Sequence, residues 1–439
     1  MRNTKLWAVV AALGVALAGP TEARATDGHF LHGVGAINAS MGGAGAAGAS
    51  DILGAMYVNP AGLMAFQGSR VDLGFELFQA DRTVASDAGP FGSGSTQSKK
   101  AYVPVPAFGW SYMLDNGKVV LGLGGLGIGG FGVDYEASTT NPILVPQPNG
   151  FGQVYSNFQL LKIAPSIAFA ASDKLWLGAA LNVDWASLAV KPMPVASPDV
   201  NPGEGTAFYP SATAADGAFG FGFQVGAIYN ASDMIALGAS YTSTQWFEEF
   251  EFSSAHANPS LPNFGTARDI SFAMDVPAVL AGGVKIQALP NMSILGDMKY
   301  IFYSNTAGFD ESGFDETGAV QGFGWDDIKV FALGTEFVAG EKVAIRAGWN
   351  HSDNPIPDEL SFFNVPAPAI VQDHLTLGLG IKFSRRFAMN LGYYYVFEGQ
   401  IEGELWGPTG PIPGTSVTNT MTESSFQIGF SVGSRGEIF

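Results

Sequence analysis

The chain has 439 residues, a formal net charge of −18 and no cysteine. The acidic excess argues against nucleic acid as a partner. Without cysteine, an exported chain must take its stability from a large hydrogen-bonded framework rather than from disulfides. Charged residues make up 14% of the chain, against roughly 25% in soluble domains. Much of the folded surface is therefore expected to face something other than water.

Residues 1–25 have the pattern of a secretory signal peptide. Arg2 and Lys5 give a positive start, 6–18 is an apolar run, and Ala23-Arg24-Ala25 is a small-x-small cleavage site. A first transmembrane helix is the weaker alternative, because the run is shorter than the roughly 20 residues that span a bilayer. Cleavage would remove three basic residues and one acidic residue, leaving 18 against 38. We expect export, with a mature chain that begins at Thr26.

Residues 26–66 lack a strand pattern and are expected to form a plug, or hatch. The segment 33–51 is almost wholly Gly, Ala, Ser and Asn, and Asn59-Pro60-Ala61-Gly62-Leu63 follows it. Asn59 suits a helix start, because its side chain can accept from an unpaired backbone N–H and proline fits the first helical position. We expect short helices and tight loops that lie inside the lumen of a barrel.

Residues 67–439 show the alternation of strands with one oily face. In 373–384, the apolar side chains at odd positions point to one side, and polar residues or glycine point to the other. Similar runs lie at 175–185, 235–241, 387–397 and 426–432. Each is about as long as a tilted membrane strand. Because no segment after residue 25 has 18 unbroken apolar residues, a closed transmembrane β-barrel is favoured over membrane helices.

Short and long connections alternate along this region. Short turns are expected at 115–117, 172–173, 232–233, 289–291, 340–341 and 384–386. Long polar or Pro/Gly-rich stretches lie between them, at 83–98, 135–156, 191–214, 251–268, 306–326, 352–370 and 399–419. Six turns and seven loops imply about fourteen antiparallel strands, as in bacterial outer-membrane barrels. A soluble β-sandwich or propeller remains the alternative, although it needs neither the unequal loops nor the signal peptide.

The second and third expected strands carry unusual residues. Pro104 and Pro106 lie in the second, although proline cannot donate to a ladder. The third strand, 118–135, is crowded with glycine: Gly122, Gly124, Gly125, Gly127, Gly129, Gly130 and Gly132. Glycine in a strand often marks a bulge or a close approach, so a kinked wall and tight packing against a plug both explain the run. If the glycines form a lateral opening, a β-branched residue at Gly125 or Gly127 should slow uptake.

At Asn59-Pro60-Ala61 the chain resembles the FadL/TodX type of outer-membrane transporters for long-chain fatty acids and aromatic hydrocarbons. These residues look like the hatch motif of that family, and segments at 220–229, 325–335 and 346–357 follow in family order. The resemblance implies a fourteen-stranded barrel, an N-terminal hatch and a kinked third strand that opens sideways. For a transporter of this kind, we expect external loops to collect the ligand, an apolar lumen pocket beside the hatch to hold it and a hatch rearrangement to release it.

Candidate ligand contacts lie in the loops 191–214 and 251–268 and in the hatch: Val195, Phe208, Phe252, Leu261, Phe264 and Phe30. An apolar pocket captures such ligands because each buried CH₂ contributes about 0.8 kcal/mol. The expected surroundings are outer-membrane lipid, lipopolysaccharide and the barrel-assembly machinery. We expect a monomer.

No catalytic constellation is recognisable, and no enzyme activity, cofactor or metal is expected. The sequence lacks HExxH and G-x-S-x-G, and its five histidines are scattered. Residues 122–127 satisfy G-x-G-x-x-G, but no helix is expected after them. The acidic residues of 310–316 are interpreted as a solvated outer face, with divalent-cation binding near lipopolysaccharide as the alternative.

Two rival functions stay open. A general diffusion porin would share the barrel but would need an open polar channel, which liposome swelling with sugars would detect. An outer-membrane lipid hydrolase would need a nucleophile with a paired base, which a lipase assay would reveal.

Overall fold

The computed structural model describes residues 27–115 and 117–434, so the predicted signal peptide lies outside the described residues. The barrel wall consists of fourteen strands: β1 (Ser69–Asp87), β3 (Tyr102–Met113), β4 (Val119–Tyr135), β5 (Val154–Ala170), β6 (Leu175–Lys191), β9 (Ala212–Asn230), β10 (Ile235–Thr242), β14 (Val279–Leu289), β15 (Met292–Ile301), β16 (Ile328–Ala339), β17 (Val343–Ser352), β18 (Asp373–Ser384), β19 (Phe387–Gly403) and β22 (Ser416–Gly433). Two short strands, β2 (Ser93–Gln97) and β11 (Trp246–Phe247), bring this sheet to sixteen.

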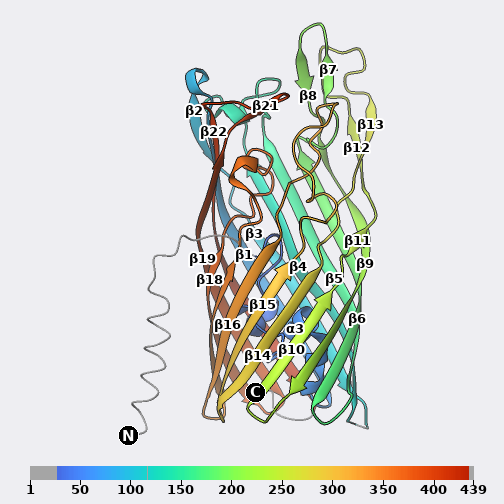
Figure 1. Cartoon of the computed structure of the whole chain (residues 1–439), viewed down its shortest axis with the longest axis vertical. Helices are drawn as coiled ribbons and strands as arrows, with labels where there is room; N and C mark the ends of the chain where they lie inside the picture. The colour runs from blue at the N-terminus through green and yellow to red at the C-terminus, as the bar shows by residue number, and fades with distance from the viewer. Residues whose placement is uncertain (1–26, 116, 435–439) are drawn as a thin grey trace.

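The sheet closes on itself. β10 pairs with both β9 and β14, and β1 pairs with both β3 and β22, always antiparallel. Figure 1 shows the resulting tall barrel, with the short turns at one end and the long connections at the other. All six predicted short turns overlap the observed ones, and the predicted fourteen-strand barrel is confirmed. Among the described residues, no helix combines the length and apolar character needed to cross a membrane.

The two faces of the wall differ as the alternation predicts. On β18, Leu377 is 54% exposed on the outside, whereas the neighbouring Thr376 is fully buried on the lumen side. Large apolar side chains are exposed at alternate positions on the other wall strands too, such as Leu73, Phe75 and Leu77 on β1. The outer face is therefore suited to lipid, and the polar residues collect in the lumen.

Strands extend further than the predicted loops allow. β1 continues to Asp87 and pairs there with β2, and β19 and β22 pair with each other as far as Gly403 and Val417. A hairpin of β12 (Phe250–Ala255) and β13 (Ala267–Phe272) occupies most of the predicted 251–268 loop. These loop limits were wrong because polar composition does not prevent backbone pairing, and alternate side chains such as Val84 and Val417 are still buried in the extended part of the sheet.

Residues 27–66 lie inside the barrel, where Figure 1 shows α3 surrounded by strands. They form α2 (Gly35–Ala39), α3 (Ile52–Val58) and the 3-10 helix η1 (Pro60–Ala65). Nearly every residue of this segment is buried. The three helices pack against wall strands from β1 to β22, so the hatch fills the lower lumen.

Candidate binding site inside the barrel

Asn59 ties the hatch to the wall. Its side-chain oxygen accepts from the backbone N–H of Ala61 at 3.0 Å and thereby caps η1, as the sequence predicts. Its amide nitrogen donates to the carbonyl oxygen of Ala46 at 2.7 Å and lies 3.2 Å from the carbonyl oxygens of Ala227 on β9 and Ala239 on β10. One fully buried side chain thus joins two parts of the hatch to two wall strands. Sequence reasoning anticipated only the cap.

Wall residues also hold α3 at both ends. At its start, the hatch residue Asp51 caps the helix by accepting the N–H of Gly54 at 3.2 Å, and the wall residue Asp72 of β1 accepts the N–H of Ile52 at 3.0 Å. At its end, Gln224 of β9 and Ser240 of β10 donate to the carbonyl oxygen of Val58, at 3.0 and 2.6 Å. These bonds satisfy backbone groups that every helix end leaves unpaired. The helix is therefore fixed across the barrel.

A ring of glycines lets the hatch approach the wall closely. A Cβ at Gly178 would collide with the backbone at Pro60 and Ala61, and one at Gly238 with the backbone at Ala46 and Ala47. We call the lumen-facing glycines that pack on the hatch the glycine ring: Gly74, Gly109, Gly122, Gly124, Gly178, Gly226, Gly238, Gly334, Gly348, Gly378, Gly392 and Gly429. Gly122 and Gly124 of the predicted glycine-rich strand contact the hatch through Met56.

The upper half of β4 departs from the regular wall. Its pairing with β3 ends at Ala107 and Leu126, and its pairing with β5 shifts register between Gly127 and Gly129. Beyond this point, residues 102–106 of β3 pair with β1, while 127–135 of β4 pair with β5. We call these facing edges the unpaired stretch. Packing on the hatch explains Gly122 and Gly124, whereas the bulge lies between Gly127 and Gly129; Gly125 has open space around it.

The two prolines lie within the unpaired stretch. Pro104 and Pro106 have β1 partners, Leu77 and Phe75, and no β4 partner. Because proline has no N–H, it is tolerated where one strand edge has no neighbour. Their presence in the second strand is therefore compatible with a wall that is interrupted on the β4 side.

Residues 27–31, which we call the docked segment, lie at the unpaired stretch and pair there with the edge of β4 that β3 leaves free. Phe30 and Gly129 form an antiparallel bridge, and Leu31 donates its N–H to the Ile128 carbonyl oxygen at 2.9 Å. Gly130 in turn donates to the His29 carbonyl oxygen at 2.9 Å. The start of the hatch therefore supplies backbone partners that β3 does not.

Tyr303 and a group of aromatic rings hold the docked segment. The Tyr303 hydroxyl accepts the His29 backbone N–H at 3.1 Å and lies 3.0 Å from His29 Nδ1. The His29 ring stacks on Phe309 with centroids 5.3 Å apart, and Trp325 lies beside it. Burial lowers the pKa of His29 to about 3, so this ring is neutral at ordinary pH. Because Phe309 and Trp325 follow β15, an external connection covers the docked segment.

A mainly apolar cavity, the lumen pocket, lies beside the docked segment. Phe30, Ile128, Val276, Val279 and Ile301 contribute apolar surface, and the polar lining includes Lys162, Gln245 and Lys299. The Lys299 ammonium forms an ion pair with Asp27 at 2.9 Å and donates to the His32 carbonyl oxygen at 3.2 Å. The pocket can therefore hold an apolar body, with a few polar groups that can orient it.

Two adjoining apolar cavities, together the loop pocket, lie among the long connections. They share Pro194, Val320, Phe363 and Pro366, and Val195 lines one of them. The Phe131 and Phe323 rings, 5.8 Å apart, line the same cavity, and Phe131 also packs on Phe158, which neighbours His29. Aromatic side chains thus connect the loop pocket with the docked segment.

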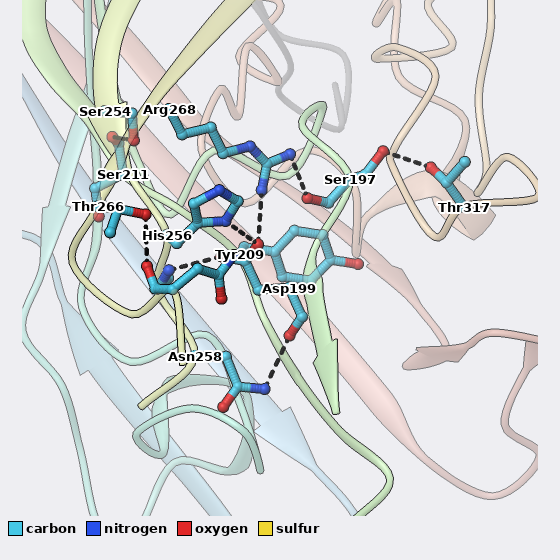
Figure 2. A network of polar contacts seen from close by, with 12 residues as sticks. Ser197, Asp199, Tyr209, Ser211, Ser254, His256, Asn258, Thr266, Arg268 and Thr317 are labelled. Carbon is cyan, nitrogen blue, oxygen red and sulfur yellow. Dashed lines mark hydrogen bonds and ion pairs between the residues drawn. The ribbon is translucent and has the colours of Figure 1, made fainter. Parts of the chain in front are cut away.

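Asp199 joins two external connections, as Figure 2 shows. Its carboxylate accepts from His256 Nδ1 at 2.7 Å and lies 3.2 Å from an Arg268 nitrogen. Arg268 also donates to the Ser197 carbonyl oxygen at 2.7 Å. Asp199 lies between β6 and β9, whereas His256 lies in the connection between β12 and β13 and Arg268 lies on β13, so these contacts position the hairpin beside the loop pocket.

The predicted ligand contacts are dispersed. Phe30 lines the lumen pocket and Val195 the loop pocket. Phe252 is buried in the core, Phe208 and Leu261 are partly exposed, and Phe264 is 55% exposed. The His32 ring lies 4.7 Å from that of His374, so two of the histidines that are scattered in the sequence lie together.

Sequence reasoning missed Lys162, Lys299 and Tyr303. A signal existed for the lysines: each stands between residues that face outward in an alternating strand, so its side chain must enter the lumen. Tyr303 lies just outside a strand and carries no such signal.

A closed antiparallel barrel with an oily exterior and a plugged, polar lumen defines a membrane β-barrel protein. The family model for outer membrane protein transport proteins (OMPP1/FadL/TodX) matches residues 17–432. The chain belongs to this family and is a protein of the bacterial outer membrane. The family consists of transport proteins rather than enzymes.

Solved structures share the fold. The toluene transporter TodX of P. putida is 18% identical, with 92% of this chain and 99% of that chain covered and a TM-score of 0.70. A FadL homologue of Pseudomonas aeruginosa is 15% identical, with 93% and 100% covered and a TM-score of 0.73. The toluene transporter TbuX of Ralstonia pickettii is 18% identical, with 90% and 98% covered and a TM-score of 0.61. No curated protein sequence matches the chain.

Proposed function

We propose that the protein carries hydrophobic small molecules, such as long-chain fatty acids or aromatic hydrocarbons, across the outer membrane. The observation that carries this proposal is the position of Phe30. Its side chain lines the lumen pocket, and its backbone pairs with Gly129 at the unpaired stretch. A ligand in the pocket therefore contacts the segment that supplies the missing wall partner. Membership of a transport family supports the same conclusion.

Capture would begin at the loop pocket and continue in the lumen pocket. Apolar linings withdraw hydrophobic molecules from water, with a gain of about 0.8 kcal/mol for each buried CH₂. Val195 is the predicted contact residue best placed for capture, because it lines the loop pocket. The rings from Phe131 to His29 would offer an apolar path between the two pockets.

Release would follow displacement of the docked segment and exit between β3 and β4. Movement of the whole hatch is the costlier alternative, since the glycine ring and Asn59 hold it against most of the wall. Asp297 of β15 adds bonds to the N–H groups of Gly45 and Ala46, at 2.6 and 2.8 Å. We therefore propose that residues 26–66 act as the hatch and that residues 27–31 are its moving part.

The remaining partners follow from the same proposal. We propose a monomer that is inserted by the barrel-assembly machinery and surrounded by outer-membrane lipid and lipopolysaccharide. The buried hatch disfavours general diffusion, because a porin needs an open aqueous channel. Liposome swelling with sugars should accordingly be no faster than in protein-free liposomes.

A disulfide lock tests the moving part. Leu31 donates its N–H to the Ile128 carbonyl oxygen directly beside the antiparallel Phe30–Gly129 bridge, so the two residues form the next cross-strand pair, at which side chains approach within about 5 Å and a disulfide is feasible. The chain has no cysteine of its own, so the double variant Leu31→Cys/Ile128→Cys can form only the intended bond. We expect uptake of radiolabelled toluene or fatty acid to fall strongly in oxidised cells and to recover with reductant.

Each single-cysteine variant serves as the matched control and should be insensitive to oxidation. Surface protein and heat-modifiable migration must be equal in all strains. Full uptake by the oxidised double variant would exclude movement of residues 27–31 from the route.

A further inference from the structure

Two buried side chains on β6 lack hydrogen-bond partners. Asn182 and Asp184 occupy lumen-facing positions and are 1% and 0% exposed. Among the described residues, none pairs with either polar atom of Asn182 or with either carboxylate oxygen of Asp184. Buried polar groups are nearly always hydrogen-bonded, because losing water costs free energy that a new partner must offset. These adjacent groups therefore form the candidate contact for a polar ligand group.

Neighbours of both side chains line the lumen pocket. Lys162 of β5 is the cross-strand partner of Asp184, and it lines the pocket. Gly222 of β9 is the cross-strand partner of Asn182, and a Cβ there would lie 2.5 Å from the Gln245 amide. Gln245 also lines the pocket, and its side-chain oxygen is another buried atom without a partner. We call Lys162, Asn182, Asp184 and Gln245 the polar corner.

The chemistry of the polar corner selects among ligand classes. It offers acceptors on Asp184, Gln245 and Asn182, and donors on Asn182 and Lys162. A hydrocarbon would leave all of these groups unpaired. A carboxylate would meet Lys162 but would be repelled by Asp184, whose charge compensates that of the lysine. A hydroxyl group fits both needs, because it donates one hydrogen bond and accepts others without carrying charge.

We propose that the lumen pocket takes hydrophobic molecules that carry a single hydroxyl group, a phenol or an alcohol, with the hydroxyl in the polar corner. The apolar body would lie against Ile128, Val279 and Ile301. This assignment rests on the proposed function, since it names the class of molecule that the same pocket transports.

Three molecules of one shape provide the test: toluene, p-cresol and p-toluate. Their binding to the purified full-length protein in detergent is measured by native mass spectrometry and by intrinsic tryptophan fluorescence. We expect p-cresol to bind about tenfold more tightly than toluene, the equivalent of one well-made hydrogen bond. An n-octane and 1-octanol pair shows whether the preference for a hydroxyl extends from phenols to alcohols.

Two variants connect this preference to the polar corner. Asp184→Asn and Asn182→Leu should each lower p-cresol affinity several-fold and leave toluene affinity unchanged. Ser166→Ala is the matched control, because Ser166 is a buried lumen hydroxyl on β5 that already donates to the Ala164 carbonyl oxygen at 3.0 Å. Heat-modifiable migration verifies that each variant folds. If one of the two variants does not fold, Gln245→Leu takes its place, because Gln245 lies outside the wall strands.

The outcomes separate this inference from the proposed function. Equal binding of toluene and p-cresol would overturn the hydroxyl assignment while leaving hydrophobic transport in place. Tightest binding of p-toluate would overturn it in favour of carboxylates. Absence of binding by toluene, p-cresol, p-toluate, n-octane and 1-octanol alike would reject the lumen pocket itself as a ligand site.

Discussion

The hydroxyl of Tyr303 lies 3.0 Å from Nδ1 of His29 and also accepts the backbone N–H of that residue at 3.1 Å. The same hydroxyl is 3.3 Å from the Asp27 carbonyl oxygen, so one side chain from the connection after β15 contacts several residues at the start of the hatch. These contacts require glycine at position 28, since a Cβ there would collide with the Tyr303 ring. Tyr303 is thus placed to control how readily the docked segment leaves β4.

Tyr303→Phe should loosen the docked segment without unfolding the barrel. The ring packing stays, and the loss of one hydroxyl costs about 1 kcal/mol, which is roughly a fivefold change in an equilibrium. We expect maleimide to label a cysteine at Leu31 about fivefold faster in this background. Tyr300→Phe is the control, because the Tyr300 hydroxyl bonds to Asp327, away from the hatch. Equal labelling rates in the two backgrounds would remove Tyr303 from the gating mechanism.

Docking should weaken as the pH falls. The pKa of His29 is about 3 when docked, because of burial, and 6.5 when exposed, so the docked state favours the neutral ring. The neutral His29 ring therefore stabilises the docked state fully above pH 6.5. Below pH 6.5, the equilibrium constant for docking falls by about tenfold for each pH unit, until the pH approaches the pKa of the docked ring. Hydrogen exchange at the amides of residues 29–31, corrected for intrinsic rates, should therefore accelerate between pH 6.5 and 5.5.

His29→Phe provides the control for this pH effect. It keeps the stacking on Phe309 but cannot take up a proton. Its exchange, corrected in the same way, should not change with pH. An equal acceleration in the wild-type protein and the variant would assign the effect to another group.

Asn59→Ala should leave the barrel assembled but alter hydrophobic uptake several-fold. The substitution removes the cap on η1 and the donor shared by Ala46 and the two wall strands, at a cost of about 1–3 kcal/mol. This cost is small for the whole barrel and large for a hatch that must keep its position. Uptake of labelled toluene or fatty acid, normalised to surface protein, is the measurement. Asp310→Ala, in an exposed loop, should change nothing; if Asn59→Ala behaves likewise, the motif has no gating role.

Gly127→Val and Gly125→Val should differ, although the sequence treats the two glycines alike. A Cβ at Gly127 would collide with Val105 on the facing edge of β3, and such overpacking costs about 1–3 kcal/mol. A Cβ at Gly125 would meet nothing within 4 Å. We expect uptake to fall several-fold for Gly127→Val only, at equal surface abundance. Equal uptake by both variants would argue against passage through the unpaired stretch.

Local sequence determined the barrel and the start of η1. Alternation along a strand and the preference for lipid on one side act within a few residues, so 373–384 identified β18 and its outer face without knowledge of its neighbours. The spacing of turns then determined the number of strands. The cap at Asn59 was also predictable, because it joins residues that are adjacent in the chain.

Only the tertiary structure decided where distant residues meet. The contact between the Tyr303 hydroxyl and His29 joins positions 274 residues apart. Lys162 faces Asp184 because β5 and β6 pair in one register out of many. The glycine ring likewise has meaning only against the hatch surface that fills it. Periodicity determines which face a side chain occupies, but partners across the lumen depend on strand register, closure of the sheet and the path of residues 27–66. These are properties of the whole fold, and no local pattern encodes them.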